Sequence, residues 1–173
     1  MRNQESILAE EIKSAALYRM DESSRMIAIA LKDLSDAKIW ERPNGISNSI
    51  GNQLLHLCGN ITQYAISSLG ETLDTRDRDA EFTTVNGLSK AELLAKLEAT
   101  VSKAKEVIEN CSMDNLIRLR KVQGFELTGI GIIMHVVEHY SYHTGQIAFW
   151  VKQAKNKPLG FYEGTDLNNK NDL

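Results

Sequence analysis

The chain has 173 residues, of which 42% are hydrophobic and 25% are charged, a composition typical of a globular protein with one hydrophobic core. Its formal net charge at pH 7 is −3, and its lysines and arginines are dispersed rather than gathered in one stripe. This pattern argues against nucleic acid and against an anionic membrane surface as partners.

The first two helices are predicted from apolar residues at helical spacing. Such residues recur every three or four positions from Glu5 to about Leu34, which indicates an amphipathic helix. The sequence ERPNGIS interrupts this pattern, and Ser47 or Ser49 can cap the start of a second helix. Gly70 is placed to end that helix. These signals predict two long helices joined by a short break.

Two further helices are predicted in the second half of the chain. The polar segment ETLDTRDRDAEFTTVNG indicates a connection that crosses the surface. Ser89 and Glu92 have the spacing of a capping box, which opens a third helix with apolar residues at helical spacing. After RLRKVQGFELTGIG, a fourth helix is expected from about Thr128 to Lys155.

The four predicted helices indicate an all-α fold. No convincing strand lies between them, and each has an apolar stripe that only the other helices can bury. We therefore predict an antiparallel up-down four-helix bundle that forms a single domain over residues 1–165. Residues 166–173 are polar and are expected to form a C-terminal tail.

Cysteine usage and the absence of targeting segments bear on the compartment. Cys58 and Cys111 form no CxxC pair and are too few for a disulfide framework, which suits a reducing environment. The N-terminal residues MRNQESILAEE lack the apolar run of a secretory signal, and no later run is long enough to span a bilayer. We therefore expect a cytoplasmic protein.

Histidines are confined to the second and fourth predicted helices. His56 lies in the second helix, and His135, His139 and His143 follow one another at intervals of four in the fourth. Side chains four positions apart on a helix lie about 6 Å apart, close enough for two imidazoles to bind one metal ion, whereas eight positions span about 12 Å. Only two neighbouring histidines of the fourth helix can therefore share an ion.

A helical wheel separates the three histidines of the fourth helix. His139 and His143 fall at the edge of its apolar stripe, whereas His135 is rotated toward the polar side. A third ligand would have to come from another helix, and His56 is the only histidine left. Its place at the margin of its own apolar stripe suits a metal ligand and a surface histidine equally. Periodicity alone leaves the choice between a metal site and hydrogen-bonded histidines open.

Two sequence motifs around these histidines resemble the DinB-like family of bacterial four-helix-bundle proteins. They are HYSYHTGQI, which starts at His139, and SIGNQLLHLCGN, which contains His56. In that family, a histidine of helix two and an HxxxH pair of a later helix, followed by a short Gly-Gln-hydrophobic segment, hold a divalent metal ion. The resemblance covers essentially the whole chain and implies that His56, His139 and His143 are metal ligands.

Two further features qualify this resemblance. The segment RDRDAEF, from Arg76 to Phe82, is similar to a segment in a subgroup of relatives, and no chemistry is assigned to it. Tyr142 stands where many relatives have another histidine, so that the substrate of any one relative does not transfer to this chain.

The resemblance implies a metal site more firmly than a particular reaction. Three neutral imidazoles leave a coordination position for water or a substrate, and zinc and nickel both suit imidazole ligands. Family members include transferases that use low-molecular-weight thiols and others described as hydrolases. The resemblance therefore implies a metal-dependent enzyme that acts on a small-molecule substrate. By analogy with the family, it also implies a homodimer. Asn60 and Gln146 are candidates for orienting a ligand or substrate, although both also suit a solvated helix surface.

Two alternatives remain open on the sequence. The first is a non-catalytic, stress-associated dimeric bundle, because no nucleophile dyad or general base is evident. The second follows from HVVEH, which spans His135 to His139 and matches the HxxEH motif of inverted zinc proteases with Glu138 as the base. That motif needs a downstream acidic ligand, for which Glu163 and Asp166 are poor candidates.

Overall fold

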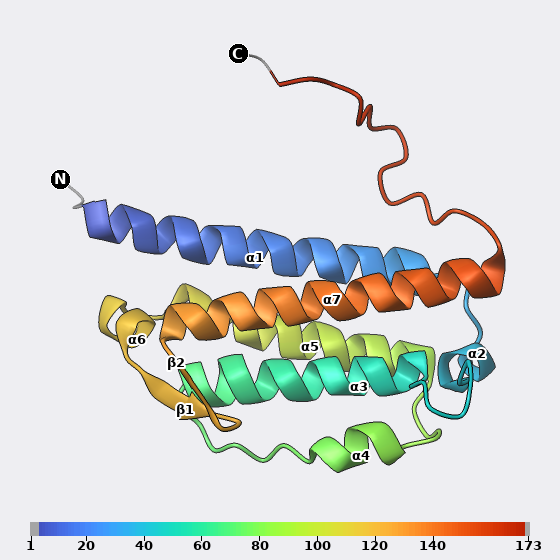
Figure 1. Ribbon diagram of the computed structural model, residues 1–173, viewed down its shortest axis with the longest axis horizontal. Helices are drawn as coiled ribbons and strands as arrows, with labels where there is room; N and C mark the ends of the chain where they lie inside the picture. Colours follow the sequence, from blue (N-terminus) through green and yellow to red (C-terminus); the bar gives the residue numbers. More distant parts are fainter. Residues whose placement is uncertain (1–3, 172–173) are drawn as a thin grey trace.

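Four long helical segments lie side by side in the computed structural model, which describes residues 4–171 (Figure 1). They are α1 (Gln4–Leu31), α3 (Ile50–Ile61) with its π-helical continuation η1 (Thr62–Leu69), α5 (Lys90–Glu109) and α7 (Gly129–Lys155). The fold is therefore mostly helical, as predicted. Within the described residues, no helix has a stretch apolar and long enough to cross a membrane.

Local capping interactions start three of these segments where the sequence predicts them. The hydroxyl of Ser89 accepts a hydrogen bond from the backbone N–H of Glu92, and the Glu92 side chain accepts one from the Ser89 backbone. Ser49, one of the two predicted caps, forms the same reciprocal box with Asn52 at the start of α3. Thr128 caps α7. These bonds satisfy backbone amides that the first helical turn leaves without partners.

Short elements occupy the connections. They are the helices α2 (Asp36–Trp40), α4 (Arg78–Thr83) and α6 (Met113–Ile117), and the strands β1 (Arg120–Val122) and β2 (Phe125–Leu127). The strands pair antiparallel, with Val122 opposite Phe125, and both Gln123 and Gly124 between them have positive φ. The expectation of no strand between the third and fourth helices is thus wrong. A two-residue turn with this backbone matches the twist of paired strands and closes a hairpin too short to show an alternating pattern.

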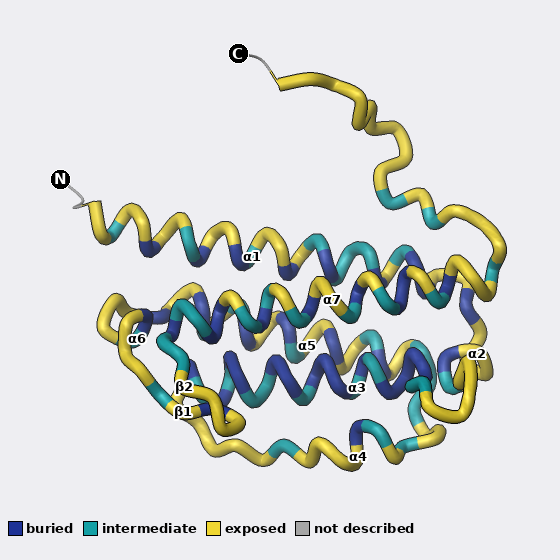
Figure 2. The backbone as a smooth tube through the Cα atoms, in the orientation of Figure 1, coloured by how far each residue is buried: buried dark blue, intermediate teal, exposed yellow. Residues whose placement is uncertain are grey.

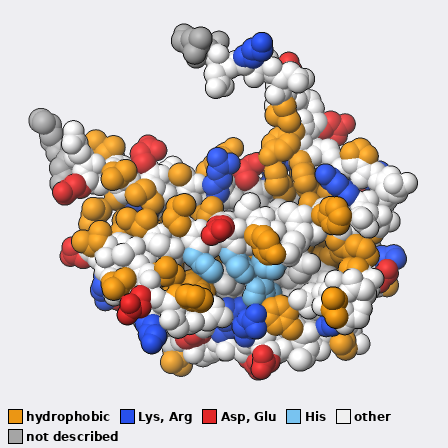
Figure 3. All heavy atoms as spheres, viewed as in Figure 1, with side chains coloured by type: hydrophobic (Ala, Val, Ile, Leu, Met, Phe, Trp, Pro, Cys, Tyr) orange, Lys and Arg blue, Asp and Glu red, His pale blue; other side chains and the backbone are white. Residues whose placement is uncertain are grey.

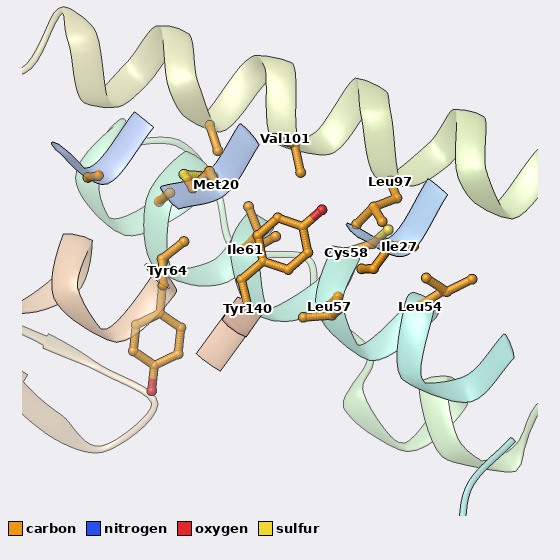
Figure 4. Packing of buried hydrophobic residues seen from close by; sticks show 14 of the residues in the cluster. Met20, Ile27, Leu54, Leu57, Cys58, Ile61, Tyr64, Leu97, Val101 and Tyr140 are labelled. Carbon is orange, nitrogen blue, oxygen red and sulfur yellow. The ribbon is translucent and has the colours of Figure 1, made fainter. Parts of the chain in front are cut away.

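Apolar side chains from all four long segments fill the space between them (Figure 4), and Figure 2 marks the buried residues that recur along each of these segments. The labelled members of this core are Met20, Ile27, Leu54, Leu57, Cys58, Ile61, Tyr64, Leu97, Val101 and Tyr140. Each fully buried large apolar side chain contributes about 1.5–3 kcal/mol, so the core fixes α3 against α7. Burial also raises the pKa of the Cys58 thiol to about 11, which keeps it protonated and unreactive at neutral pH.

The described chain beyond α7 forms no further helix or strand and extends away from the bundle (Figure 1). Its first part is tethered, since Arg25 of α1 donates a hydrogen bond of 2.8 Å to the backbone carbonyl of Phe161. The predicted boundary of the polar tail at residue 166 stays a prediction, and residues 172 and 173 of that tail lie outside the described residues.

Candidate metal centre

Three histidines from two helices meet between α3 and α7. His56 comes from α3, and His139 and His143 come from adjacent turns of α7. One ligand nitrogen of each lies within 4.8 Å of the other two, and Nε2 of His56 is 3.2 Å from Nε2 of His139. The structure therefore brings together the three residues that the sequence singles out as metal ligands.

The spacing of the imidazoles fits a divalent ion. Imidazole nitrogens bind zinc at about 2.0–2.1 Å in tetrahedral sites, which places neighbouring nitrogens about 3.3 Å apart. The His56–His139 nitrogen separation of 3.2 Å agrees with this value. By contrast, Nδ1 of His139 is buried and has no hydrogen-bond partner within the described residues, so no contact at that nitrogen fixes which nitrogen of the ring carries the hydrogen.

Burial keeps the α7 imidazoles neutral. It lowers the pKa of His139 to about 3, and the neighbouring His143 and His56 act in the same direction. Burial and the adjacent His56 also lower the pKa of His143 to about 4, against a hydrogen bond with Gln146 that raises it. Both rings thus carry a free lone pair at neutral pH, which metal coordination requires.

A buried ion pair adjoins His56. Nδ1 of His56 lies 2.8 Å from Oε2 of Glu81, and both Glu81 oxygens accept hydrogen bonds from the guanidinium of Arg76, at 2.7 and 2.8 Å. The Arg76 and Glu81 side chains are only 2% and 8% exposed. Burial alone would raise the pKa of the Glu81 carboxyl, but the hydrogen bonds from Arg76 and His56 hold it below its ordinary value.

This ion pair is not predictable from a sequence pattern. Its only signal is the RDRDAEF segment, which the sequence assigns to a surface connection without chemistry. The segment instead contains most of α4, whose first turn is capped by the Asp77 side chain, and it turns Arg76 and Glu81 inward against α3. His56 is correspondingly buried rather than a surface histidine.

His135 lies beside the histidine cluster without joining it. Its ring stacks on Tyr64 with a centroid distance of 3.9 Å, and its Nε2 lies 3.2 Å from the Asn60 side-chain amide. The side of α7 on which His135 lies, which the helical wheel places toward the polar residues, is therefore covered by α3 and η1. The side-chain amide of Asn60 thus lies against His135, and Gln146 acts on the pKa of His143, whose Nδ1 has no hydrogen-bond partner within the described residues.

The comparisons with known proteins place the chain in a family. The sequence profile described as "Protein of unknown function (DUF1572)" matches residues 8–161. The chain belongs to the DUF1572 family. No curated protein matches it.

Two solved structures resemble this DUF1572 chain in fold. A conserved protein from Enterococcus faecalis has a TM-score of 0.72 and 15% identity, with 83% of this chain and 97% of that chain covered. A DinB-like protein from Bacillus subtilis has a TM-score of 0.62 and 16% identity, with 85% and 93% covered. The resemblance to DinB-like proteins that the histidine motifs indicate is confirmed in the fold.

The histidine cluster of this DUF1572 chain is reached from solvent. Figure 3 shows imidazole groups gathered at the surface in the middle of the face formed by α3 and α7. The exposed ring of Tyr142 packs edge-on against His143 at 5.0 Å between centroids and forms part of the rim. The HxxEH alternative loses support, because His135 is not among the clustered histidines and Glu138 is exposed.

Gly59 provides the space that the Glu81 carboxylate occupies. A β-carbon at this position would overlap the Glu81 carboxylate and approach Nε of Arg76 to 3.0 Å. We expect Gly59→Ala to displace Glu81, to lower the free energy of unfolding by about 1–3 kcal/mol through overpacking, and to weaken metal binding. Denaturant unfolding and a metal competition titration would measure both effects.

Gly145→Ala is the matched control for this prediction. Gly145 also lies within a helix, but a β-carbon there would have no neighbour within 4 Å. Alanine raises helix propensity equally at both positions, so only the overlap with Glu81 distinguishes them. Equal stability and equal metal affinity for the two variants would show that Glu81 moves freely out of the way.

Proposed function

We propose that this chain binds one divalent metal ion, zinc or nickel, through His56, His139 and His143 and acts as a metal-dependent enzyme. The observation that carries the proposal is the convergence of three imidazole nitrogens within 4.8 Å of one another on a solvent-accessible face. The match in fold to a DinB-like protein supports it. Nitrogen ligands suit both metals, and affinity order alone does not choose between them.

The arrangement suits catalysis better than a closed structural site. Structural zinc sites are enclosed by four protein ligands, whereas three ligands leave one position for a substrate. When bound, the ion would supply a Lewis acid at that position. Of the chain's own residues, Glu81 contacts His56, Gln146 acts on His143, and the Tyr142 ring forms the rim past which a small molecule would enter.

We propose a small-molecule reaction, either transfer of a low-molecular-weight thiol or a hydrolysis. A thiol fits an open position on a nitrogen-ligated zinc or nickel ion, because sulfur is a good ligand for both metals. We also propose that the chain is cytoplasmic, where such thiols stay reduced. We propose that the helical segments form an antiparallel up-down bundle over residues 1–165, of which residues 1–3 lie outside the described residues.

A homodimer is the assembly we propose. A groove between α1 and α7 is lined by Ile12, Ala15, Met26, Met134 and Val137, and Tyr18 and Phe149 on the same two helices are 59% and 65% exposed. Apolar surface of this kind on two long helices suits a helix-to-helix contact between subunits.

The test starts from protein stripped with a chelator and then supplied with Zn²⁺ or Ni²⁺. We expect about one ion bound per chain by mass spectrometry after dialysis, and turnover with a panel of thiols plus electrophiles or with simple esters and amides. Failure to retain either ion would contradict the proposal. Stoichiometric binding without turnover on any panel would instead favour a non-catalytic metal-binding bundle.

A further inference from the structure

We infer that the Arg76–Phe82 segment is the positioning element of the metal site, with Glu81 as the residue that fixes the tautomer and orientation of His56. This inference rests on the proposed metal site and goes beyond it, because it assigns a role to residues outside the proposed ligand set. The segment contributes a charged contact to the edge of the His56 ring and an aromatic contact to its face.

Glu81 determines which nitrogen of His56 carries the hydrogen. Oε2 of Glu81 lies 2.8 Å from Nδ1, and a carboxylate so close requires a hydrogen on that nitrogen, since two lone pairs would otherwise face each other. Nη2 of Arg76 also lies 3.1 Å from Nδ1, but it donates to Oε2 of Glu81 at the shorter distance of 2.8 Å, and that oxygen can only accept from Nδ1. The lone pair of His56 is therefore on Nε2, the nitrogen that faces His139.

Arg76 holds Glu81 in the orientation that this contact needs. The guanidinium donates from Nε to one carboxylate oxygen and from Nη2 to the other, a two-point contact that leaves the carboxylate little freedom to rotate. The remaining group, Nη1, donates to the Gln63 side chain at 2.9 Å. A chain of hydrogen bonds thus runs from Gln63 of η1 to the ligand histidine of α3.

The face of the His56 ring is also constrained from α4. The ring of Phe82 lies 4.8 Å from it between centroids at an interplanar angle of 40°. By contrast, Nδ1 of His139 and Nδ1 of His143 have no hydrogen-bond partner within the described residues. Among the three histidines, His56 is therefore the one that a carboxylate orients before an ion binds. A carboxylate at this position also raises the basicity of the imidazole, so that its Nε2 lone pair binds a metal ion more strongly.

The test compares Zn²⁺ dissociation constants of wild type, Glu81→Gln and the matched control Asp79→Asn by competition with a chromophoric chelator. The substituted amide would have one acceptor oxygen where Arg76 and His56 need two, so one of these partners loses its bond. We expect Glu81→Gln to bind Zn²⁺ about 10- to 100-fold more weakly. Asp79, an exposed acidic residue of the same helix, should be replaceable within about twofold, because surface substitutions away from such contacts have small effects.

Long-range ¹H–¹⁵N spectra of the metal-free protein report which nitrogen of His56 carries the hydrogen. A purely structural role of Glu81 would leave this tautomer unchanged when Glu81 is substituted. Wild type should show His56 with its hydrogen on Nδ1, and Glu81→Gln should shift the population toward Nε2. The near-isosteric amide preserves the volume of the side chain, so the variant remains a usable test.

The outcomes separate this inference from the proposed function. Wild type that binds no Zn²⁺ would overturn the metal site itself. Wild type that binds Zn²⁺, together with a Glu81→Gln variant of unchanged affinity and unchanged His56 tautomer, would overturn the positioning role alone.

Discussion

Replacing His139 with alanine is expected to weaken metal binding about a hundredfold or more. A structural zinc site provides about 10–16 kcal/mol, so one ligand of four accounts for roughly 3 kcal/mol, which corresponds to about two orders of magnitude in affinity. His139 is central to the site, because its Nε2 lies 3.2 Å from that of His56 and its ring is 4.6 Å from the ring of His143 between centroids. Metal content after dialysis and a chelator competition titration would measure the loss.

His135→Ala is the control for this variant. His135 lies on the same helix one turn away, and its ring is 5.4 Å from that of His139, but it is not among the clustered histidines. Loss of a residue that supports a metal ligand typically weakens metal binding by about 10- to 100-fold. We expect His135→Ala to stay below that range, with a Zn²⁺ affinity within about tenfold of wild type. If His135→Ala lost the metal ion and His143→Ala kept it, the ligands would be those of the HxxEH motif instead.

Removing Arg76 alone is expected to destabilise the metal-free protein by about 3–5 kcal/mol. Arg76→Leu would leave the Glu81 carboxylate buried without its two-point partner, and an unpaired buried charge costs far more than the pair contributes. The side chains are 2% and 8% exposed, so solvent cannot replace the lost hydrogen bonds without local opening. Denaturant unfolding monitored by circular dichroism would measure the change.

The double variant Arg76→Leu/Glu81→Leu separates charge burial from loss of packing. Replacing both members of a buried ion pair with apolar residues is often close to neutral, so we expect the double variant to be more stable than Arg76→Leu. If the double variant were instead no more stable than Arg76→Leu, the unpaired buried charge would not be the cause of the loss in the single variant.

Helix starts could be predicted from sequence because their signals are local. The Ser89–Glu92 box and the Thr128 cap each depend on residues three positions apart. The β1–β2 hairpin could not be predicted in the same way. Its strands have three residues each, too few for an alternating pattern, and Gln123 at positive φ is an unusual turn residue.

The histidine cluster was predictable in part. The spacing of His139 and His143 indicated a pair, and the family resemblance added His56, but a helical wheel describes only the angle around one helix. It could not show that Tyr64 of η1 covers the side on which His135 lies. The contact between His56 and Glu81 joins residues 25 positions apart through an irregular connection, and no periodicity in the sequence encodes it.

X-ray absorption at the edge of the bound ion is the decisive measurement for the three-histidine site, because it reports the atoms around the metal. For Zn²⁺-loaded wild type, we expect scattering from three imidazole rings at about 2.0–2.1 Å, together with at least one oxygen from solvent. Fewer than three imidazoles, or a sulfur ligand, would contradict it.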